Sequence, residues 1–518
     1  MLWEVDVHLR QNDPATQDLI DAANDLGLSM HTAQTATGWL IEGDISLNEV
    51  QEIGTCLFTD PVTEVCRVAK AGDEVLITKP PGSSEAHNLI LHVLPKPGVT
   101  DPAAESAKEA MLVLGVRATA VRSVKKYWLP ANCITPEQAE DIAWKLLASE
   151  AIHEVVIGAL QLTKLSGGDE WALERKQVSL NGLSDSDLEA LSHRQCLALT
   201  ANELHAVRDH FQTLDREPFE IELETIAQTW SEHCCHKTLG SPIDHSGPHG
   251  ESCYDNLLKE TVFASTEIVR RQLGANDWCV SVFRDNSGVV RFDGDHDICV
   301  KVETHNHPSA IEPYGGAATG LGGVIRDVLG TGHGAKPLAN LDVFCVAPLE
   351  TPPATIPPGI IPPKRLLHGV VAGVRDYGNR MGIPTIAGAV AFHPGYLGNP
   401  LVFCGTVGIM PRDSADGRIE PGDLVVTAGG RTGRDGIHGA TFSSIELSSE
   451  SESKSGGSVQ IGHAIHEKTL TDFILAASEE NLFNAITDCG AGGLSSAVGE
   501  MGAELGAELD LKKVPLKY

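Results

Sequence analysis

One segment, residues 300–337 (VKVETHNHPSAIEPYGGAATGLGGVIRDVLGTGHGAKP), constrains the fold of this chain more than any other. Its first part alternates apolar and polar residues as a strand does, so Lys301, Glu303 and His305 share one face. A cation, a carboxylate and an imidazole in that row suit phosphate binding, Mg²⁺ binding and proton transfer respectively. The alternative is a solvated edge strand whose polar side chains have no chemical role.

A run of glycines follows the strand and precedes the helix-like sequence VIRDVLG. Glycines before a helix N-terminus predict a phosphate cradle, although the spacing matches neither the P-loop nor the dinucleotide-binding motif. The other interpretation is that the glycines only permit close packing. Arg326 and Asp327 stand side by side on the helix, where one suits a substrate phosphate and the other a metal ion. A surface ion pair is the alternative for these two residues.

Two histidines and two cysteines crowd into His233–His236, within the sequence ETIAQTWSEHCCHKTLG. Adjacent helical residues point about 100° apart, and zinc ligands are normally spaced by two to four residues, so the pattern argues against a structural zinc site. The functional interpretation is that His233, near a helix end, meets an anionic substrate or transfers a proton. The alternative is that the segment simply packs a helix end.

Further glycine-rich turns occur at 429–444 (GGRTGRDGIHGATFSS) and 487–502 (TDCGAGGLSSAVGEMG). The polar, Ser-rich stretch 448–457 between them predicts a mobile loop, and VQIG at 459–462 follows it. Asp488 precedes a glycine-rich turn into a helix, a place that suits a carboxylate on Mg²⁺ beside a phosphate. Together these segments favour an enzyme of Mg-nucleotide or phosphate chemistry.

The 518 residues are enough for several domains. The strand and helix patterns of residues 1–67 recur further along the first 160 residues, so we expect a duplicated β-α-β-β-α-β unit there. Residues 161–220 predict a helical linker. From 221 onwards Gly, Ala and Val increase, and strands alternate with helices as in an α/β or α+β domain; DLVVTAG at 423–429 is one expected strand.

Composition excludes several classes of function. The net charge of −31 lacks the basic footprint of nucleic-acid binding and repels anionic membrane surfaces. No apolar run reaches the roughly 18 residues of a membrane-spanning helix, and the N-terminus does not read as a signal peptide. Twelve cysteines without a CxxC pair indicate free thiols in a reducing compartment. We therefore expect a cytoplasmic protein with no nucleic-acid or membrane partner.

Four motifs give a specific resemblance. AQTWSEHCCHKT, VKVETHNHPSAIEPYGGAATGLGGVIRD, GGRTGRDGIHGATF and DCGAGGLSSAVGEMG resemble the phosphoribosylformylglycinamidine synthase family, over about residues 180–518. The resemblance implies an α+β chain of four parts: a duplicated accessory-subunit-like domain (1–160), a helical linker (161–220), a synthetase-like N-terminal domain (221–411) and a truncated synthetase-like C-terminal domain (412–518).

The implied activity is that of a C–N ligase in purine biosynthesis. With ATP, formylglycinamide ribonucleotide is converted through an iminophosphate to the amidine, with release of ADP and phosphate. Ammonia comes from glutamine in a separate glutaminase subunit or domain. The implied cofactors are ATP and Mg²⁺. Alternatives are a non-catalytic nucleotide-binding scaffold and another ATP-dependent enzyme of the superfamily, such as a selenophosphate or thiamine-phosphate enzyme.

The resemblance also implies residue roles. His233 and His305 match catalytic histidines, the latter a proton acceptor. The implied ATP contacts are His236 and Lys301. Implied substrate contacts are Thr304, His305, Asn306, His307, Arg326 and Gln460, and implied Mg²⁺ ligands are Glu303, Asp327 and Asp488. Smaller family members have tyrosine where this chain has His236, which weakens that ATP contact.

Two parts of the family's enzyme have no counterpart up to Tyr518: a second synthetase-like half and a glutaminase with its cysteine nucleophile. The resemblance therefore predicts the front part of a longer or split enzyme. Because sites in this superfamily form between paired halves, we expect residues 1–518 alone to have little activity unless they dimerise or meet the missing half.

Overall fold

The computed structural model describes residues 1–11, 13–78, 88–165, 174–433, 436–443 and 460–517. The chain divides into two compact units. The first comprises Met1–Ala172 with Pro352–Arg365, and the second comprises mainly Leu173–Thr351, Leu366–Ser449 and Ser458–Tyr518. Each unit has its own six-stranded sheet. The expected mobile loop at 448–457 lies outside the described residues.

The sheet of the first unit has the strand order β3-β1-β2-β5-β4-β6, with every pair antiparallel. Its elements are β1 (Leu2–Leu9), α1 (Pro14–Asp25), β2 (Gln34–Glu42), α2 (Leu47–Cys56), β3 (Glu64–Lys70), α3 (Glu74–Ile77), β4 (Asn88–Pro95), α4 (Pro102–Val113), β5 (Ala120–Pro130), α5 (Pro136–Ile142), a π-helical turn (Ala143–Leu147) and β6 (His153–Ile157).

The expected duplication corresponds to two similar halves, but their element order differs from the expectation. Each half has three strands and two long helices in the order β-α-β-α-β, not β-α-β-β-α-β. The physical reason is that the stretch between β2 and β3 contains one helix and no further alternating run. The two halves join through the β2–β5 pair, where Gln34–Glu42 lies antiparallel to Ala120–Trp128.

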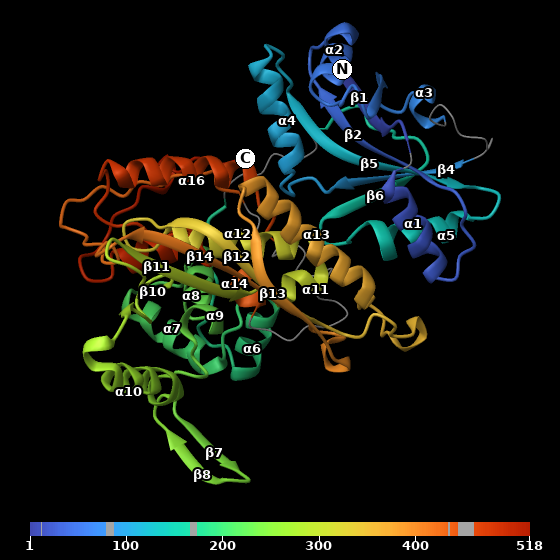
Figure 1. Ribbon diagram of the computed structural model, residues 1–518. Helices are drawn as coiled ribbons and strands as arrows, with labels where there is room; N and C mark the ends of the chain where they lie inside the picture. The colour runs from blue at the N-terminus through green and yellow to red at the C-terminus, as the bar shows by residue number, and fades with distance from the viewer. Residues whose placement is uncertain (12, 79–87, 166–173, 434–435, 444–459, 518) are drawn as a thin grey trace. The chain divides into compact units, whose positions relative to one another are not determined.

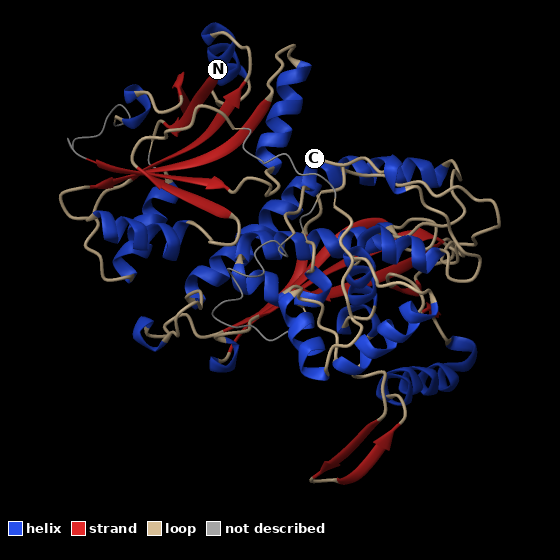
Figure 2. Cartoon of the chain, turned by 180° about the vertical axis from the view of Figure 1, so that it is seen from behind, coloured by secondary structure: helices blue, strands red, loops and turns tan. Residues whose placement is uncertain are grey.

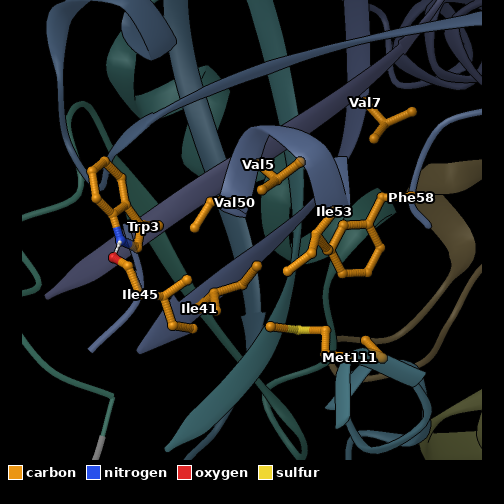
Figure 3. Close-up of a cluster of buried hydrophobic side chains, with 10 residues drawn as sticks. Trp3, Val5, Val7, Ile41, Ile45, Val50, Ile53, Phe58 and Met111 are labelled. Atoms are coloured by element: carbon orange, nitrogen blue, oxygen red, sulfur yellow. Dashed lines mark hydrogen bonds between the residues drawn. The ribbon is translucent and has the colours of Figure 1, made fainter. Parts of the chain in front are cut away.

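The face of this sheet that the helices cover carries two hydrophobic clusters. On β1, Trp3, Val5 and Val7 point to the helices and are buried with residues of β2, α2 and α4 (Figure 3). Trp3 Nε1 donates a 2.8 Å hydrogen bond to the Ile45 carbonyl, so the indole is buried without an unpaired donor. A second cluster, around Leu91 and Leu129, buries α1 and α5 against β4 and β5.

The second unit begins with three capped helices, α6 (Asp185–Arg194), α7 (Ala201–Thr213) and α8 (Glu220–Thr229). Ser184 and Thr200 form capping boxes with the residues three positions on, which satisfies the first backbone donors of α6 and α7. Leucines on the three helices bury one another in a cluster of their own. Helices α6 and α7 thus lie within residues 161–220, for which the sequence predicts a helical linker.

The six-stranded sheet of the second unit has the order β13-β12-β14-β11-β10-β9 (Figures 1 and 2). Its strands are β9 (Cys279–Ser281), β10 (Gly288–Arg291), β11 (His296–Thr304), β12 (Lys336–Val346), β13 (Thr385–Phe392) and β14 (Leu401–Pro411). All pairs are antiparallel except β12–β13. A separate hairpin, β7 (Ile243–Gly247) and β8 (Gly250–Tyr254), and helix α10 (Ala264–Leu273) project away from this sheet (Figure 1).

Three long helices accompany this sheet: α12 (Pro313–Leu329), α13 (Pro363–Met381) and α16 (Ala464–Glu479). Shorter helices are α9 (Glu232–Cys235), α11 (Asn306–Ile311), α14 (Gly439–Phe442) and α17 (Gly493–Met501). Helix α12 packs on β11, β12 and β14 and also contacts α16. Among the described residues, no helix is both long and apolar enough to cross a membrane.

Helix α12 runs through the whole glycine run, which corrects one expectation. It begins at Pro313, so the glycines of 315–323 lie inside the helix and not before it. A Cβ on Gly316 would fall 2.4 Å from a backbone nitrogen of α11, and one on Gly320 would fall 2.8 Å from the Cβ of His305. The predicted phosphate cradle is therefore wrong, and the glycines instead allow close packing of α12 on its neighbours.

The expected strand at 423–429 is also absent from the described residues. Leu424 and Val426 are 89% and 80% exposed, and the segment has no ladder partner. An alternating apolar sequence becomes a strand only when a neighbouring strand accepts its backbone hydrogen bonds and covers its apolar face. The sequence pattern alone does not supply that partner.

Candidate functional site

The polar face of β11 meets α12 through its lysine. Lys301 Nζ lies 2.8 Å from Glu303 Oε1 and 3.3 Å from Asp327 Oδ2. Burial alone would lower the pKa of Lys301, but the two carboxylates outweigh it and raise the pKa. The ammonium is thus held charged at the base of the site. The predicted alignment of residues 301 and 303 on one strand face is confirmed.

A second ion pair lies one residue along α12. Arg326 Nε donates a 2.8 Å hydrogen bond to Asp488 Oδ2, although 162 positions separate the two residues. Burial opposes the charge of Arg326, yet Asp488 raises the pKa of the guanidinium. Asp488 precedes the glycine-rich turn into α17, as the sequence predicted, and both residues are largely buried rather than a surface pair.

Asp327 is the most perturbed carboxyl group of this site. Burial, together with the negative charges of Asp488 and Glu303, raises its pKa to about 7, while Lys301 and Arg326 oppose the shift. A carboxylate in that position repels its neighbours unless a cation stands between them. The three carboxyl groups therefore form an electrostatic setting that favours added positive charge.

These three carboxylates do not form a closed protein cage for a metal. Among the described residues, they are not a group whose ligand atoms all lie within 4.8 Å of one another. Mg²⁺ is commonly held by one or two carboxylates together with substrate phosphates, and such a site does not need a protein cage. Glu303, Asp327 and Asp488 fit that open kind of site, with the cations Lys301 and Arg326 beside them.

His305 follows Thr304, the last residue of β11, and is the N-cap of α11, so it lies just beyond the strand whose face it was predicted to share with Lys301 and Glu303. Its backbone nitrogen donates 2.8 Å to the Val402 carbonyl, and Asn306 Oδ1 accepts 2.8 Å from the Val402 nitrogen, so β14 fixes this corner from both sides. Burial lowers the pKa of His305 to about 4, and its Nδ1 is buried without a hydrogen-bond partner. The imidazole is neutral at neutral pH and has a nitrogen available to a ligand or a proton.

His233 lies on α9, in electrostatic contact with the end of β11. Burial of the ring lowers its pKa, although the residue keeps access to solvent, and Glu303 opposes the shift. Ser443 Oγ lies 3.4 Å from its Nδ1, which brings the end of α14 to the histidine. Among the described residues, residues 233 to 236 are not a group whose ligand atoms lie within 4.8 Å of one another.

His236 is the C-cap of α9 and has a left-handed backbone, with φ at 49°. The residue is exposed. Loop contacts set this turn: Glu232 Oε2 accepts from the Thr238 nitrogen at 2.9 Å and from its hydroxyl at 2.7 Å. The turn therefore places an imidazole on left-handed backbone, which is uncommon for residues other than Gly but which His, like Asn and Asp, adopts more often than most.

Gln460 stands at the start of the last described segment. Thr319 Oγ1 of α12 donates a 2.6 Å hydrogen bond to the Gln460 carbonyl and accepts 3.1 Å from the Gly462 nitrogen. The Gln460 side chain lies beside Gly436, whose added Cβ would fall 3.4 Å from the Gln460 Cβ. The glutamine is thus brought to the same helix that carries Arg326 and Asp327.

Two further groups belong to this region and escaped prediction. Tyr377 of α13 donates a short hydrogen bond to Glu467 Oε2 of α16, and Glu467 Oε1 is buried without a partner. Burial raises the pKa of Glu467 to about 7. Elsewhere, His438 Nδ1 lies 2.9 Å from Glu224 Oε1, which ties the loop before α14 to α8. No local spacing signals these pairs, because their partners are far apart in the chain.

Comparison with known proteins places three family models on this chain. Residues 188–237 match the formylglycinamide ribonucleotide amidotransferase linker domain. Residues 284–410 match the N-terminal domain of AIR synthase related proteins, and residues 420–518 match the corresponding C-terminal domain. Lys301 and Arg326 thus lie in one matched domain, and Asp488 lies in the other.

Relatives of similar sequence carry a common name. The chain is 39% identical over 348 residues to the phosphoribosylformylglycinamidine synthase subunit PurL of Thermoplasma acidophilum, an alignment that covers 66% of this chain and 42% of the relative. It is 38% identical over 346 residues to the PurL subunit of Thermoplasma volcanium, with the same coverage. The chain thus spans about 42% of the length of these relatives.

Solved structures of similar sequence include PurL of Thermotoga maritima complexed with FGAR, at 34% identity with a TM-score of 0.45. That match covers 61% of this chain and 44% of the other. A second, PurL of the same organism complexed with ATP, has 32% identity and a TM-score of 0.42, covering 61% and 43%.

Proposed function

We propose, from the premise that this chain is a homologue of the PurL synthases, that it provides the front synthetase part of a phosphoribosylformylglycinamidine synthase. The reaction joins ammonia to formylglycinamide ribonucleotide with ATP, and yields the amidine, ADP and phosphate. The observation that carries the proposal is the pair of ion pairs Lys301–Glu303/Asp327 and Arg326–Asp488, which combines cations and carboxylates in one site.

The cations would bind phosphate groups. Phosphoryl transfer depends mainly on positioning and charge neutralisation, and the site contains one ammonium and one guanidinium held by carboxylates. Lys301 suits the nucleotide phosphates, and Arg326 suits the phosphate of the ribonucleotide, to which a guanidinium can donate two parallel hydrogen bonds. The raised pKa of Asp327 supports this assignment. Bound phosphate groups would replace the carboxylates that Lys301 now contacts.

Mg²⁺ would be held by Glu303, Asp327 and Asp488, and it would neutralise the phosphate oxygens during transfer. The raised pKa of Asp327 supports this choice, since a buried carboxylate among carboxylates gains most from a nearby cation. Lys301 keeps its charge in this setting and so contributes to the same neutralisation.

The two histidines would handle protons at the carbon of the glycinamide group. Phosphorylation of the glycinamide oxygen gives an iminophosphate; ammonia then adds to its carbon, phosphate leaves, and the added nitrogen must lose protons. His305, neutral because burial lowers its pKa to about 4, has an unpartnered Nδ1 that suits a proton acceptor. His233 lies near Glu303, and its lowered pKa likewise keeps it neutral at pH 7.

The remaining contacts are assigned around these groups. Thr304–His307 would line the substrate at the end of β11, and the hydrogen bonds of Val402 support a fixed geometry for that corner. Gln460 would contact the substrate from the segment held by α12. His236 is the weakest assignment: an exposed imidazole is a small stacking surface for adenine.

An open sheet face supports a partner for this unit. Val300 and Val302 point away from Lys301 and are 39% and 51% exposed. Strand β13 (Thr385–Phe392) is exposed along its whole length, and its second edge has no partner strand among the described residues. Open apolar faces and free edges mark association surfaces. The proposed partner is a second synthetase half or a second copy, with a glutaminase as ammonia source.

The proposal includes the four-part division at residues 160, 220 and 411 and a cytoplasmic location. All twelve cysteines are free, which supports a reducing compartment. Because the chain is acidic, the proposal includes no nucleic-acid or membrane partner.

The direct test is ATP turnover with ammonia and formylglycinamide ribonucleotide, measured as phosphate release and amidine formation. The chain is assayed alone and with the C-terminal part of a PurL relative. Turnover that depends on the ribonucleotide and increases with the second half supports the proposal. A chain that binds Mg-ADP but never the ribonucleotide is a scaffold, and that result contradicts the proposal.

A further inference from the structure

The segment that carries Gln460 has no regular secondary structure, so side-chain contacts must set its position. Residues 460–463, directly before α16, form no helix or strand of their own. Thr319 binds this segment twice, by donating to the Gln460 carbonyl and accepting from the Gly462 nitrogen. A hydroxyl does both jobs at once because it is donor and acceptor.

The geometry around Gly462 leaves this segment little freedom. An added Cβ there would fall 2.7 Å from Tyr377 Cε2 and 3.5 Å from Thr319 Oγ1. Tyr377 is itself fixed by its hydrogen bond to Glu467. Both the Tyr377 ring and the Thr319 hydroxyl thus lie against Gly462, where a side chain would otherwise stand.

Thr319 itself lies on a buried part of α12, about two turns before Arg326 and Asp327. If the hydroxyl is removed without loss of volume, two backbone groups lose their partner: the Gln460 carbonyl and the Gly462 N–H. Both hydrogen bonds are partly buried, and unpaired backbone groups in such a place cost free energy, so the segment would move to find other partners. Gln460 would move with it.

We infer that Thr319 is a positioning residue that sets Gln460 for the substrate and thereby contributes to recognition of the ribonucleotide, without touching the nucleotide phosphates. The inference rests on the proposed function, because only there does Gln460 contact the substrate. The Lys301 side of the site makes none of these hydrogen bonds. The two ligands should therefore respond differently to changes at Thr319.

The test compares Thr319→Val with Thr319→Ser. Valine keeps the shape and removes the hydroxyl, whereas serine keeps the hydroxyl. Thr469→Val, on the exposed side of α16, is the matched control. Affinities for formylglycinamide ribonucleotide and for Mg-ADP are measured by calorimetry, and hydrogen exchange of the peptide containing Gly462 reports its amide. T319V should weaken substrate binding about tenfold, speed exchange and leave Mg-ADP affinity within about twofold; T319S and the control should resemble the unmodified chain.

A double-mutant cycle separates positioning from general damage. Thr319 acts through Gln460, so Thr319→Val should cost no further substrate affinity in a Gln460→Ala background. Additive losses, or a T319V chain with unchanged substrate affinity, overturn the inference while leaving the proposed function intact. If T319V does not fold, T319S provides the test through hydrogen exchange of the Gly462 amide. Exchange as slow as in the unmodified chain supports the inference, and exchange as fast as in an unfolded peptide overturns it. An unmodified chain that binds Mg-ADP but no ribonucleotide overturns the proposed function, and with it the role of Thr319.

Discussion

Arg326 Nε and Asp488 Oδ2 lie 2.8 Å apart, and this contact joins the two matched synthetase-like domains at their common site. The pair is largely buried, so each charge depends on the other. If one residue of the pair is removed, the other remains as an uncompensated buried charge. That change costs more free energy than the intact pair contributes to stability.

Arg326 and Asp488 should therefore be strongly coupled. Asp488→Asn and Arg326→Gln should each lower the unfolding midpoint, while the double variant should lose less than the sum, with a coupling energy of about 1–3 kcal/mol. The measurement is denaturant unfolding of the four chains. Strictly additive losses would show that the contact contributes nothing of its own.

The glycines of α12 offer a matched pair of substitutions. Gly316→Ala places a Cβ 2.4 Å from backbone of α11, whereas a Cβ on Gly323 meets nothing within 4 Å. Overpacking of this kind costs about 1–3 kcal/mol, but Ala in an open helical position gains up to about 1 kcal/mol over Gly. Thermal unfolding should therefore show G316A below and G323A at or above the unmodified chain. The same midpoint for both variants would refute the packing explanation.

The first unit contains a buried ion cluster without any assigned role. Lys126 Nζ lies 2.6 Å from Glu4 Oε1 and 2.7 Å from Asp6 Oδ2, and all three side chains are buried. Burial raises the pKa of Asp6 to about 7, while Lys126 opposes the shift.

Lys126→Met should destabilise the first unit by about 3–5 kcal/mol, because it leaves two buried carboxyl groups with only Arg67, 3.6 Å from Asp6 Oδ2, as a neighbouring cation. Lys125 is exposed on the adjacent position, so Lys125→Met is the control and should change stability by less than about 0.5 kcal/mol. Chemical denaturation of both variants checks the expectation. Similar midpoints for the two lysine variants would mean that Lys126 is not needed for its neighbours.

The contact between His438 and Glu224 predicts a pH dependence of stability. The carboxylate raises the pKa of His438, although burial opposes it. A raised histidine pKa means that the stabilisation is fully present below about pH 6.5, the unfolded value, and is lost as pH rises through the folded pKa. The pair is partly exposed, so solvent screening keeps its contribution below about 1 kcal/mol.

The unmodified chain should therefore exceed His438→Gln in unfolding midpoint at pH 5.5, and the difference should shrink by pH 8.5. Glu224→Gln should give the same pH profile as H438Q. A difference between the chains that stays constant across this range would exclude the ion pair as its cause.

The sequence correctly predicted that Lys301 and Glu303 share one face of a strand. Side chains alternate along a strand with a period of two, and this pattern depends only on neighbouring residues. The helix caps formed by Ser184 and Thr200 also depend only on residues a few positions away. It misassigned the glycine run, since glycines before a helix and glycines inside one look alike until the neighbours are known.

Long-range contacts explain what the sequence could not reveal. Tyr377 and Glu467 are 90 positions apart, and Thr319 and Gln460 are 141 apart. Neither pair has a spacing that marks it, and their importance follows only from the way α12, α13 and α16 pack. The predicted strand at 423–429 failed for the same reason, because a strand depends on partners elsewhere in the chain.

The central claim is that Lys301, Glu303 and Asp327 form a site for a magnesium-bound nucleotide. The most direct measurement is the calorimetric affinity of Mg-ADP for the unmodified chain and for Glu303→Gln, which keeps the shape of the side chain and removes its charge. The account predicts binding to the first and an affinity at least about tenfold weaker for the second. Equal affinities, or no Mg-ADP binding by the unmodified chain, would contradict it.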